Sequence, residues 1–173
     1  MEKNPRIYLF LIPGFFGFDQ VGGINYFHHV KDYLESHLRE RGFDPEIEAV
    51  RTLPTASIRR RSARVLETID STVDQEAPIH LIGHSTGGLD ARLLTSPGVD
   101  LPTDIDPEKH LDKIDSVISI ATPHNGTPLA NYFNSLSGKN LLYVLSLFTV
   151  YSLRFGHLPL SILFYLTGYL MKF

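Results

Sequence analysis

The sequence contains no cysteine, and this absence excludes several kinds of chemistry at once. There can be no disulfide bond, no thiolate metal site and no cysteine nucleophile. The absence does not settle the compartment, because exported proteins can also lack cysteine. A strong charge of one sign is missing too: 16 basic and 19 acidic side chains give a net charge of −3, which offers no electrostatic basis for binding nucleic acid.

Long hydrophobic runs are also scarce. The first apolar run, residues 7–12, stops at Pro13 and Gly14. It is too short for the core of a signal peptide, and no small-residue cleavage site follows it. Residues 141–153 and 158–171 are longer, but a helix that spans a bilayer needs about 20 residues. The compartment therefore stays open between the cytoplasm and export without a cleaved signal.

What the sequence does contain is the composition of a folded domain, with 43% hydrophobic and 20% charged residues over 173 positions. Apolar runs alternate with amphipathic stretches, which favours an α/β fold with a doubly wound, mostly parallel sheet. The predicted strands are 7–12, 46–50, 79–82 and 116–121. The predicted helices are 25–41, one that starts at Thr55 or Ser57 and runs to 73, and 86–94. We predict one domain over residues 1–173, with its core in residues 6–128.

Helical spacing also predicts which side chains face the core. In the first predicted helix, apolar residues at 27, 30, 33, 34 and 38 share one face. From residue 129 onward the sequence is almost uncharged and rich in apolar and aromatic residues. Apolar composition alone allows core or cap helices there, or surfaces that meet lipid.

The most informative stretch is residues 83–88, Gly-His-Ser-Thr-Gly-Gly, between a predicted strand and a predicted helix. It has the pattern G-x-S-x-G of a nucleophile elbow, in which the serine occupies a strained strand-to-helix turn. The glycines are needed because side chains at Gly83 and Gly87 would collide with the closely approaching backbone. The turn exposes the Ser85 hydroxyl at a helix N-terminus, where unpaired N–H groups favour negative charge.

Two charged stretches have both a functional and a structural interpretation. Residues 59–61 are all arginine and Arg64 follows, which fits either an anionic partner or, as we favour, a solvated helix face. Residues 96–113 hold several aspartates, whose spacing does not match a calcium loop. A surface loop is favoured there, and we predict no metal and no cofactor.

Three segments together resemble landmarks of the bacterial triacylglycerol lipases of the α/β-hydrolase superfamily. They are residues 13–19 (Pro-Gly-Phe-Phe-Gly-Phe-Asp), 83–88, and 121–126 (Ala-Thr-Pro-His-Asn-Gly). The resemblance covers residues 6–135, with the landmarks in the family's order and close to its spacing. One difference is that the first loop begins Pro13-Gly14, where the family usually has His-Gly.

The resemblance implies roles for residues at these landmarks. Ser85 is the implied nucleophile, and the backbone N–H groups of Phe15 and Thr86 form the implied oxyanion hole. Each such donor is worth on the order of 3 kcal/mol, because ester attack places negative charge on the carbonyl oxygen. Phe16 and His84 are the implied substrate-binding residues. The implied substrates are acylglycerols or similar lipid esters, cleaved through an acyl-serine intermediate.

The resemblance also implies that residues 129–173 form lid-like helices. Their apolar surface would be exposed in an open state, so we expect transient contact with a lipid interface through residues 141–171.

The remaining members of a catalytic triad are not evident. In this superfamily an acid and then a histidine follow the nucleophile, on loops after later strands, and no strand-like segment follows residue 121. The histidines after the nucleophile are His110, His124 and His157, and each fits a structural role better. We therefore expect an incomplete α/β-hydrolase fold, from a truncated chain that lacks the triad's acid and histidine. A non-catalytic binding or scaffold protein and an acyltransferase are the alternatives.

Overall fold

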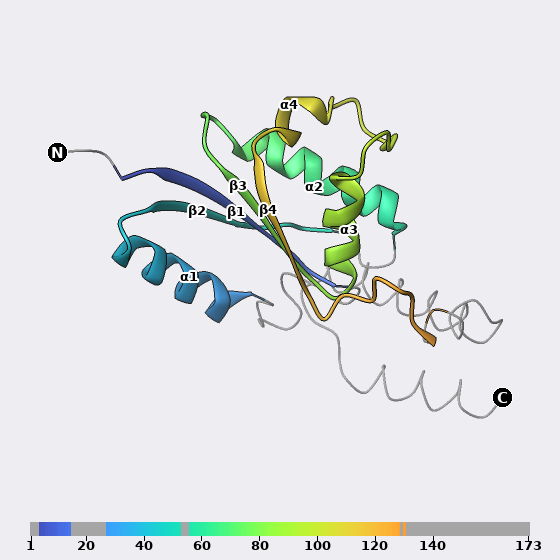
Figure 1. Ribbon diagram of the computed structural model, residues 1–173, viewed down its shortest axis with the longest axis horizontal. Coiled ribbons are helices and arrows are strands. Elements are labelled where there is room, and N and C mark those ends of the chain that lie inside the picture. Colours follow the sequence, from blue (N-terminus) through green and yellow to red (C-terminus); the bar gives the residue numbers. More distant parts are fainter. Residues whose placement is uncertain (1–3, 15–26, 53–55, 129, 131–173) are drawn as a thin grey trace, which may run out of the picture.

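The computed structural model of the chain describes residues 4–14, 27–52, 56–128 and 130. Within them, four strands form one sheet in the order β2-β1-β3-β4, and every neighbouring pair is parallel (Figure 1). The strands are β1 (Arg6–Ile12), β2 (Asp44–Ala49), β3 (Ile79–His84) and β4 (Ile114–Ile120). The helices are α1 (His28–Glu40), α2 (Ile58–Thr72), α3 (Thr86–Leu94) and the short α4 (Glu108–Leu111).

Helices lie on both faces of this sheet. In Figure 1, α1 lies against one face beside β2, while α2 and α3 pack together on the other face. Parallel strands need long crossover connections, and the helices within those connections cover the sheet. The predicted doubly wound parallel sheet is confirmed. The chain passes from β1 outward to β2 and then returns to β3, so the strand order reverses between β1 and β3.

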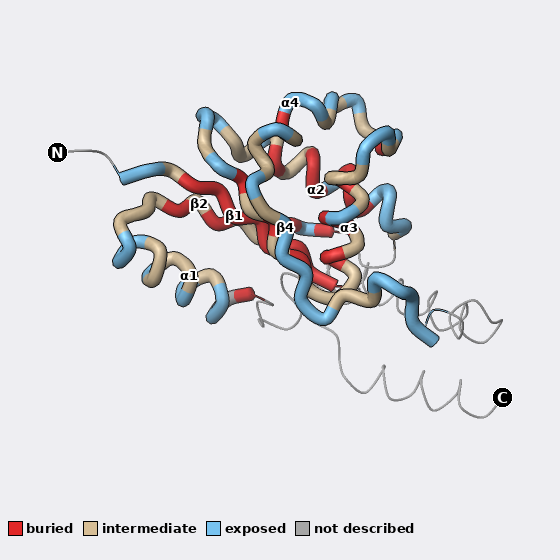
Figure 2. The backbone as a smooth tube through the Cα atoms, viewed as in Figure 1, coloured by how far each residue is buried: buried red, intermediate tan, exposed pale blue. Residues whose placement is uncertain are grey.

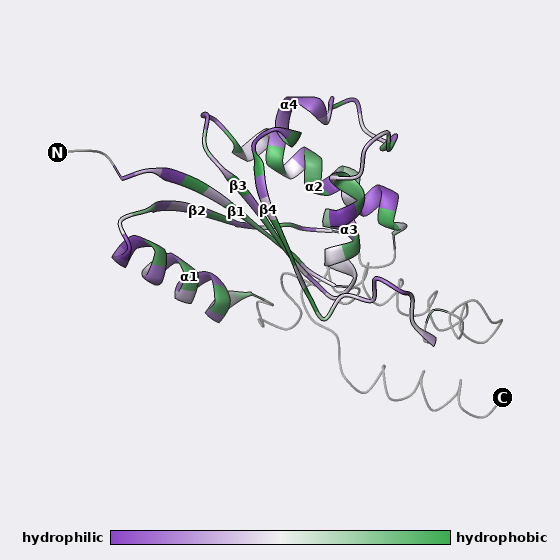
Figure 3. Ribbon diagram, viewed as in Figure 1, coloured by the Kyte–Doolittle hydropathy of each residue, from purple (hydrophilic) through white to green (hydrophobic). Residues whose placement is uncertain are grey.

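The central strand β1 is buried on both faces, as its unbroken apolar run predicts (Figure 2). Tyr8, Phe10 and Ile12 belong to the larger core cluster, which includes apolar side chains of α2 and α3. The alternate side chains of β1 belong to a smaller cluster with Phe27 and Ile47 on the α1 side. Figure 3 shows mixed hydrophilic and hydrophobic residues along α1, as expected for a helix buried on one side only.

Two details of α1 differ from the sequence-based expectation. Val30 and Tyr33 were expected to face the core, but they are 45% and 61% exposed. Only part of the predicted apolar face packs on the sheet, through Phe27, Leu34 and Leu38. Val30 and Tyr33 lie outside this stripe, which is narrower than the helical spacing predicts.

The predicted lid, residues 129–173, lies outside the described residues apart from residue 130. In the part of the chain that the structure describes, no helix is long and apolar enough to cross a bilayer.

Candidate active site

Ser85 occupies the sharp turn between the end of β3 and the start of α3. Its backbone has φ 54° and ψ −127°. A positive φ is uncommon for a residue with a side chain, and such strain costs about 1–3 kcal/mol. The Ser85 N–H donates a 2.8 Å hydrogen bond to the carbonyl of Ile120, which fixes the turn to the end of β4. This is the strained strand-to-helix turn that the sequence predicts.

The glycines on either side of Ser85 leave no room for side chains. A β-carbon on Gly83 would lie 2.4 Å from the backbone nitrogen of Gly88, and one on Gly87 would lie 2.2 Å from the carbonyl oxygen of Ile12. Both obstructing atoms belong to the backbone, so no flexible group could move aside. The predicted need for glycine at both positions is confirmed.

The other two motif loops contact the elbow directly. A β-carbon on Gly14 would lie 2.7 Å from the β-carbon of Ser85 and 3.1 Å from its Oγ. On the opposite side, a β-carbon on Gly88 would lie 2.1 Å from Oγ1 of Thr122. The segments after β1, β3 and β4 therefore meet at the carboxyl edge of the sheet. They meet where the strand order reverses, the usual position of ligand sites in such folds.

Backbone donors are available beside the serine. Thr86 is the first residue of α3, and the first N–H groups of a helix have no partner within the helix. They carry the positive end of the helix dipole, which favours an anion. His84 is partly buried next to Ser85. Phe15 and Phe16, the other predicted site residues, lie outside the described residues.

A buried ion pair lies behind this site, and the sequence-based interpretation of Arg61 was wrong. Arg61 was assigned with its neighbours to a solvated helix face, but its side chain is only 2% exposed and that of Asp90 is fully buried. Its Nε donates a 2.8 Å hydrogen bond to Oδ2 of Asp90, and its Nη2 lies 2.7 Å from the same oxygen. Its Nη2 also donates to the carbonyl of Pro13 at 2.7 Å, and both Nη atoms lie 3.5 Å from the carbonyl oxygen of Gly14.

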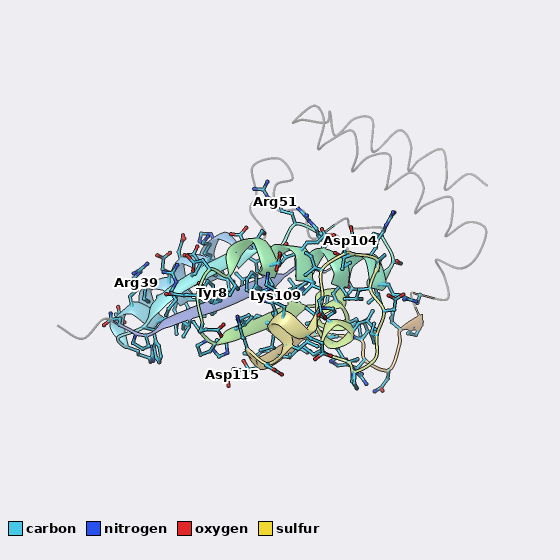
Figure 4. All side chains as sticks on the ribbon, turned by 90° about the horizontal axis from the view of Figure 1, so that it is seen from above. Tyr8, Arg39, Arg51, Asp104, Lys109 and Asp115 are labelled. Carbon is cyan, nitrogen blue, oxygen red and sulfur yellow. The ribbon has the colours of Figure 1, made fainter. Side chains whose placement is uncertain are left out.

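The rest of the arginine tract is exposed, as predicted. Arg59 lies 3.3 Å from a carboxylate oxygen of Asp100, and Arg64 lies 3.0 Å from one of Glu67. In Figure 4, Arg51 and Asp104 lie on the same side of the molecule as the outer face of α2. The ion pairs of Arg59 with Asp100 and of Arg64 with Glu67 contribute little to stability, because water screens exposed charges.

Comparison with known proteins finds two lipases that are similar to this chain in sequence. The chain is 32% identical over 130 residues to a triacylglycerol lipase from Pseudomonas fragi. It is 29% identical over 128 residues to a triacylglycerol lipase from Vibrio cholerae. The aligned segments cover 74% and 73% of this chain, but only 38% and 35% of the two lipases.

The chain belongs to the lipase and esterase family of α/β-hydrolases. No family model matches this lipase-family chain. Among solved structures, a metagenomic carboxyl esterase aligns with a TM-score of 0.47 and 19% identity, over 77% of this chain and 35% of its own.

The histidines of the lipase-family chain do not provide a base for Ser85 within the described residues. The Ser85 hydroxyl makes no hydrogen bond there. His110 is buried, and its Nε2 lies 2.8 Å from a carboxylate oxygen of Asp70 in α2, which ties the connecting segment to that helix. His124 is exposed, with its Nδ1 3.4 Å from Arg92. His157 lies outside the described residues. Across that same part of the chain, no cluster of His, Asp or Glu is arranged to hold a metal ion.

A second serine, histidine and aspartate lie together on β3 and β4, but their geometry excludes a triad. Nδ1 of His80 is 2.8 Å from Oγ of Ser116 and 3.9 Å from Oδ2 of Asp115. Both oxygens therefore approach the same ring nitrogen. A triad needs the serine at one nitrogen and the acid at the other, so that the ring can transfer a proton.

The buried carboxyl of Asp90 predicts a pH dependence of stability. Burial raises the pKa of Asp90 to about 6 from 3.8, against the opposing effect of Arg61. A carboxyl whose pKa rises on folding contributes stability below its unfolded pKa, and this is lost as the pH rises through the folded value. Between pH 4 and 7 we expect the parent to lose on the order of 3 kcal/mol of unfolding free energy relative to Asp90→Asn. Urea denaturation of both proteins across this range is the measurement, and parallel pH profiles would contradict the prediction.

Proposed function

We propose that Ser85 is the nucleophile of a serine ester hydrolase that acts on acylglycerols or similar lipid esters. The observation that carries this proposal is the conformation of Ser85, a strained turn at a helix N-terminus with Gly14 against its hydroxyl. Backbone strain of this kind persists only where the surrounding structure enforces it, and it concentrates at functional sites.

The chemistry follows from the groups around the turn. Oγ of Ser85 attacks the ester carbonyl carbon and passes its proton to a base, and the carbonyl oxygen becomes negatively charged. The backbone N–H groups of Thr86 and Phe15 stabilise this oxyanion. Collapse of the intermediate breaks the ester C–O bond, and the alcohol leaves with a proton. Water then releases the fatty acid from the acyl-serine, and Ser85 regains its proton.

The base and its acid partner are assigned to residues outside the described part of the chain. In the described part of the chain, no histidine forms a hydrogen bond with the Ser85 hydroxyl, although a serine nucleophile needs such a base. The aligned segments cover little more than a third of each lipase relative, which is consistent with an acid and a histidine outside the aligned residues.

The substrate class rests on the relatives. Both are triacylglycerol lipases, which supports a lipid ester as the substrate. We further propose that Phe16 and His84 contact the acyl chain or the ester, and that residues 141–171 meet the lipid interface. Phe16 and residues 141–171 lie outside the described residues.

Covalent labelling tests the role of Ser85. A fluorophosphonate probe reacts with an activated serine, so we expect one adduct, mapped to Ser85 by mass spectrometry. Ser96→Ala, two residues after the end of α3, is the matched control and should label as the parent does. Absence of the adduct would favour a non-catalytic scaffold with the same fold. If labelling occurs, transfer of the acyl group to an added alcohol in preference to water would instead indicate an acyltransferase.

A further inference from the structure

Arg61 connects the two segments that are proposed to bind the oxyanion. It projects from α2, pairs with Asp90 in α3, and donates to the carbonyl of Pro13 in the segment after β1. We infer that Arg61 is a positioning residue for the oxyanion hole, held in its orientation by Asp90. This inference rests on the proposed function of Ser85.

The covalent geometry of the peptide group explains how a cation behind the site could position a donor within it. The Gly14 carbonyl shares one peptide group with the N–H of Phe15, a residue outside the described part of the chain. A trans peptide directs its N–H opposite to its carbonyl. Arg61 lies on the carbonyl side, 2.7 Å from the oxygen of Pro13 and 3.5 Å from that of Gly14. It therefore favours N–H groups that point away from α2, and a cation at the carbonyl also makes the amide N–H a stronger donor.

Asp90 in α3 holds the guanidinium of Arg61 in place. One guanidinium nitrogen, Nε, donates to Oδ2 of Asp90 at 2.8 Å and a second, Nη2, lies 2.7 Å from the same oxygen, which sets the direction of the planar group. The hydroxyl of Ser62 donates to the backbone carbonyl of Asp90 at 2.9 Å, so α2 and α3 are also bonded beside the pair. Because Thr86 begins α3, the pair links the helix that carries one proposed oxyanion donor to the segment that carries the other.

The energetics indicate that the pair is not present for stability. Burial disfavours the charged carboxylate, and Oδ1 of Asp90 has no hydrogen-bond partner among the residues that the structure describes. Arg61 also lies in the first turn of α2, where the helix dipole disfavours a cation. Buried ion pairs of this kind can often be replaced by apolar residues without loss of stability. We infer that the pair is present because it positions the carbonyls of Pro13 and Gly14.

Arg61→Lys is the first test, because lysine keeps the charge but lacks the planar fork. Ester turnover is measured in the full chain as it exists, after titration of reactive Ser85 with a fluorophosphonate. We expect kcat per titrated serine to fall by about 10- to 100-fold with KM nearly unchanged, since the oxyanion exists only in the transition state. Arg60→Lys, an exposed neighbour on the same helix, should match the parent. A merely structural Arg61 would lower the titrated fraction and leave kcat per site unchanged, which would overturn the inference.

A second test does not depend on turnover. Hydrogen exchange is compared in the parent, Arg61→Lys and Arg60→Lys. We expect the amides of Gly14 and Phe15 to exchange at least about five times faster in Arg61→Lys alone, with the amides of β1 and β3 unchanged. Equal exchange at Gly14 and Phe15 would refute the inference even if the chain hydrolysed no ester.

A paired replacement separates position from stability. Arg61→Met combined with Asp90→Leu should unfold at least as cooperatively as the parent and should lose as much kcat per titrated serine as Arg61→Lys. Full kcat in this double variant would overturn the inference. Turnover that survives Ser85→Ala would instead refute the proposed function, so the two failures are distinguishable.

Discussion

Replacement of Ser85 by alanine is expected to abolish ester turnover while the chain stays folded. The hydroxyl is the only group on this side chain that can form an acyl intermediate, and loss of a serine nucleophile whose base is in place costs at least about three orders of magnitude in kcat. The hydroxyl makes no hydrogen bond within the described residues, so its removal should leave the elbow intact. The measurement is kcat/KM for a short p-nitrophenyl ester, with circular dichroism as the control for folding. Undiminished turnover would show that another residue is the nucleophile.

Comparing Ser85→Gly with Ser85→Ala measures the backbone strain at position 85, because neither variant has the hydroxyl. Ser85→Ala retains a β-carbon at φ 54°, whereas Ser85→Gly relieves the strain and is equally inactive. Relief of about 1–3 kcal/mol exceeds the usual cost of a more flexible unfolded chain, so we expect Ser85→Gly to be more stable than Ser85→Ala by about 1 kcal/mol or more. Equal urea midpoints for the two variants would show that the turn is unstrained.

The sheet and the meeting of the motif loops could be predicted because both follow from local pattern and from chain direction. The apolar run at residues 7–12 indicates a strand buried on both faces, and β1 is such a strand. Parallel strands end at one edge of a sheet, so loops that follow them must lie close together. The contacts of Gly14 with Ser85 and of Gly88 with Thr122 realise this expectation.

The buried arginine was missed because charge was given more weight than helical position. Arg61 lies four and eight residues before Val65 and Ile69, which places all three on the inner face of α2. That spacing was a usable signal. Its partner Asp90 offered a weaker one, as a lone acid within a buried stretch of α3. The sequence could not predict that Arg61 also donates to the carbonyl of Pro13, because every residue has a backbone carbonyl and no sequence pattern distinguishes this one.

Gly87→Ala is expected to destabilise the chain by more than about 3 kcal/mol, although simple helix propensity predicts the opposite. Gly87 lies in α3, and alanine is about 1 kcal/mol more favourable than glycine in a helix interior. Here, however, the new β-carbon would lie 2.2 Å from the carbonyl oxygen of Ile12 and 2.7 Å from that of Pro13. These atoms end the central strand, so α3 must move away from β1 to make room. The same movement would separate Ser85 from Gly14 and lower activity in the protein that remains folded.

Gly98→Ala is the matched control for Gly87→Ala, because it has the opposite environment. Gly98 has a positive φ of 69°, but no atom of the described residues lies within 4 Å of a β-carbon placed there. Its replacement should cost only the backbone strain of about 1 kcal/mol. Urea denaturation of the parent and both variants compares the two costs directly. If Gly87→Ala proves no more destabilising than Gly98→Ala, the close approach of α3 to the end of β1 does not hold. In that case the elbow would not be confined by the central strand, and the position of Ser85 would have to depend on its own turn and its bond to Ile120.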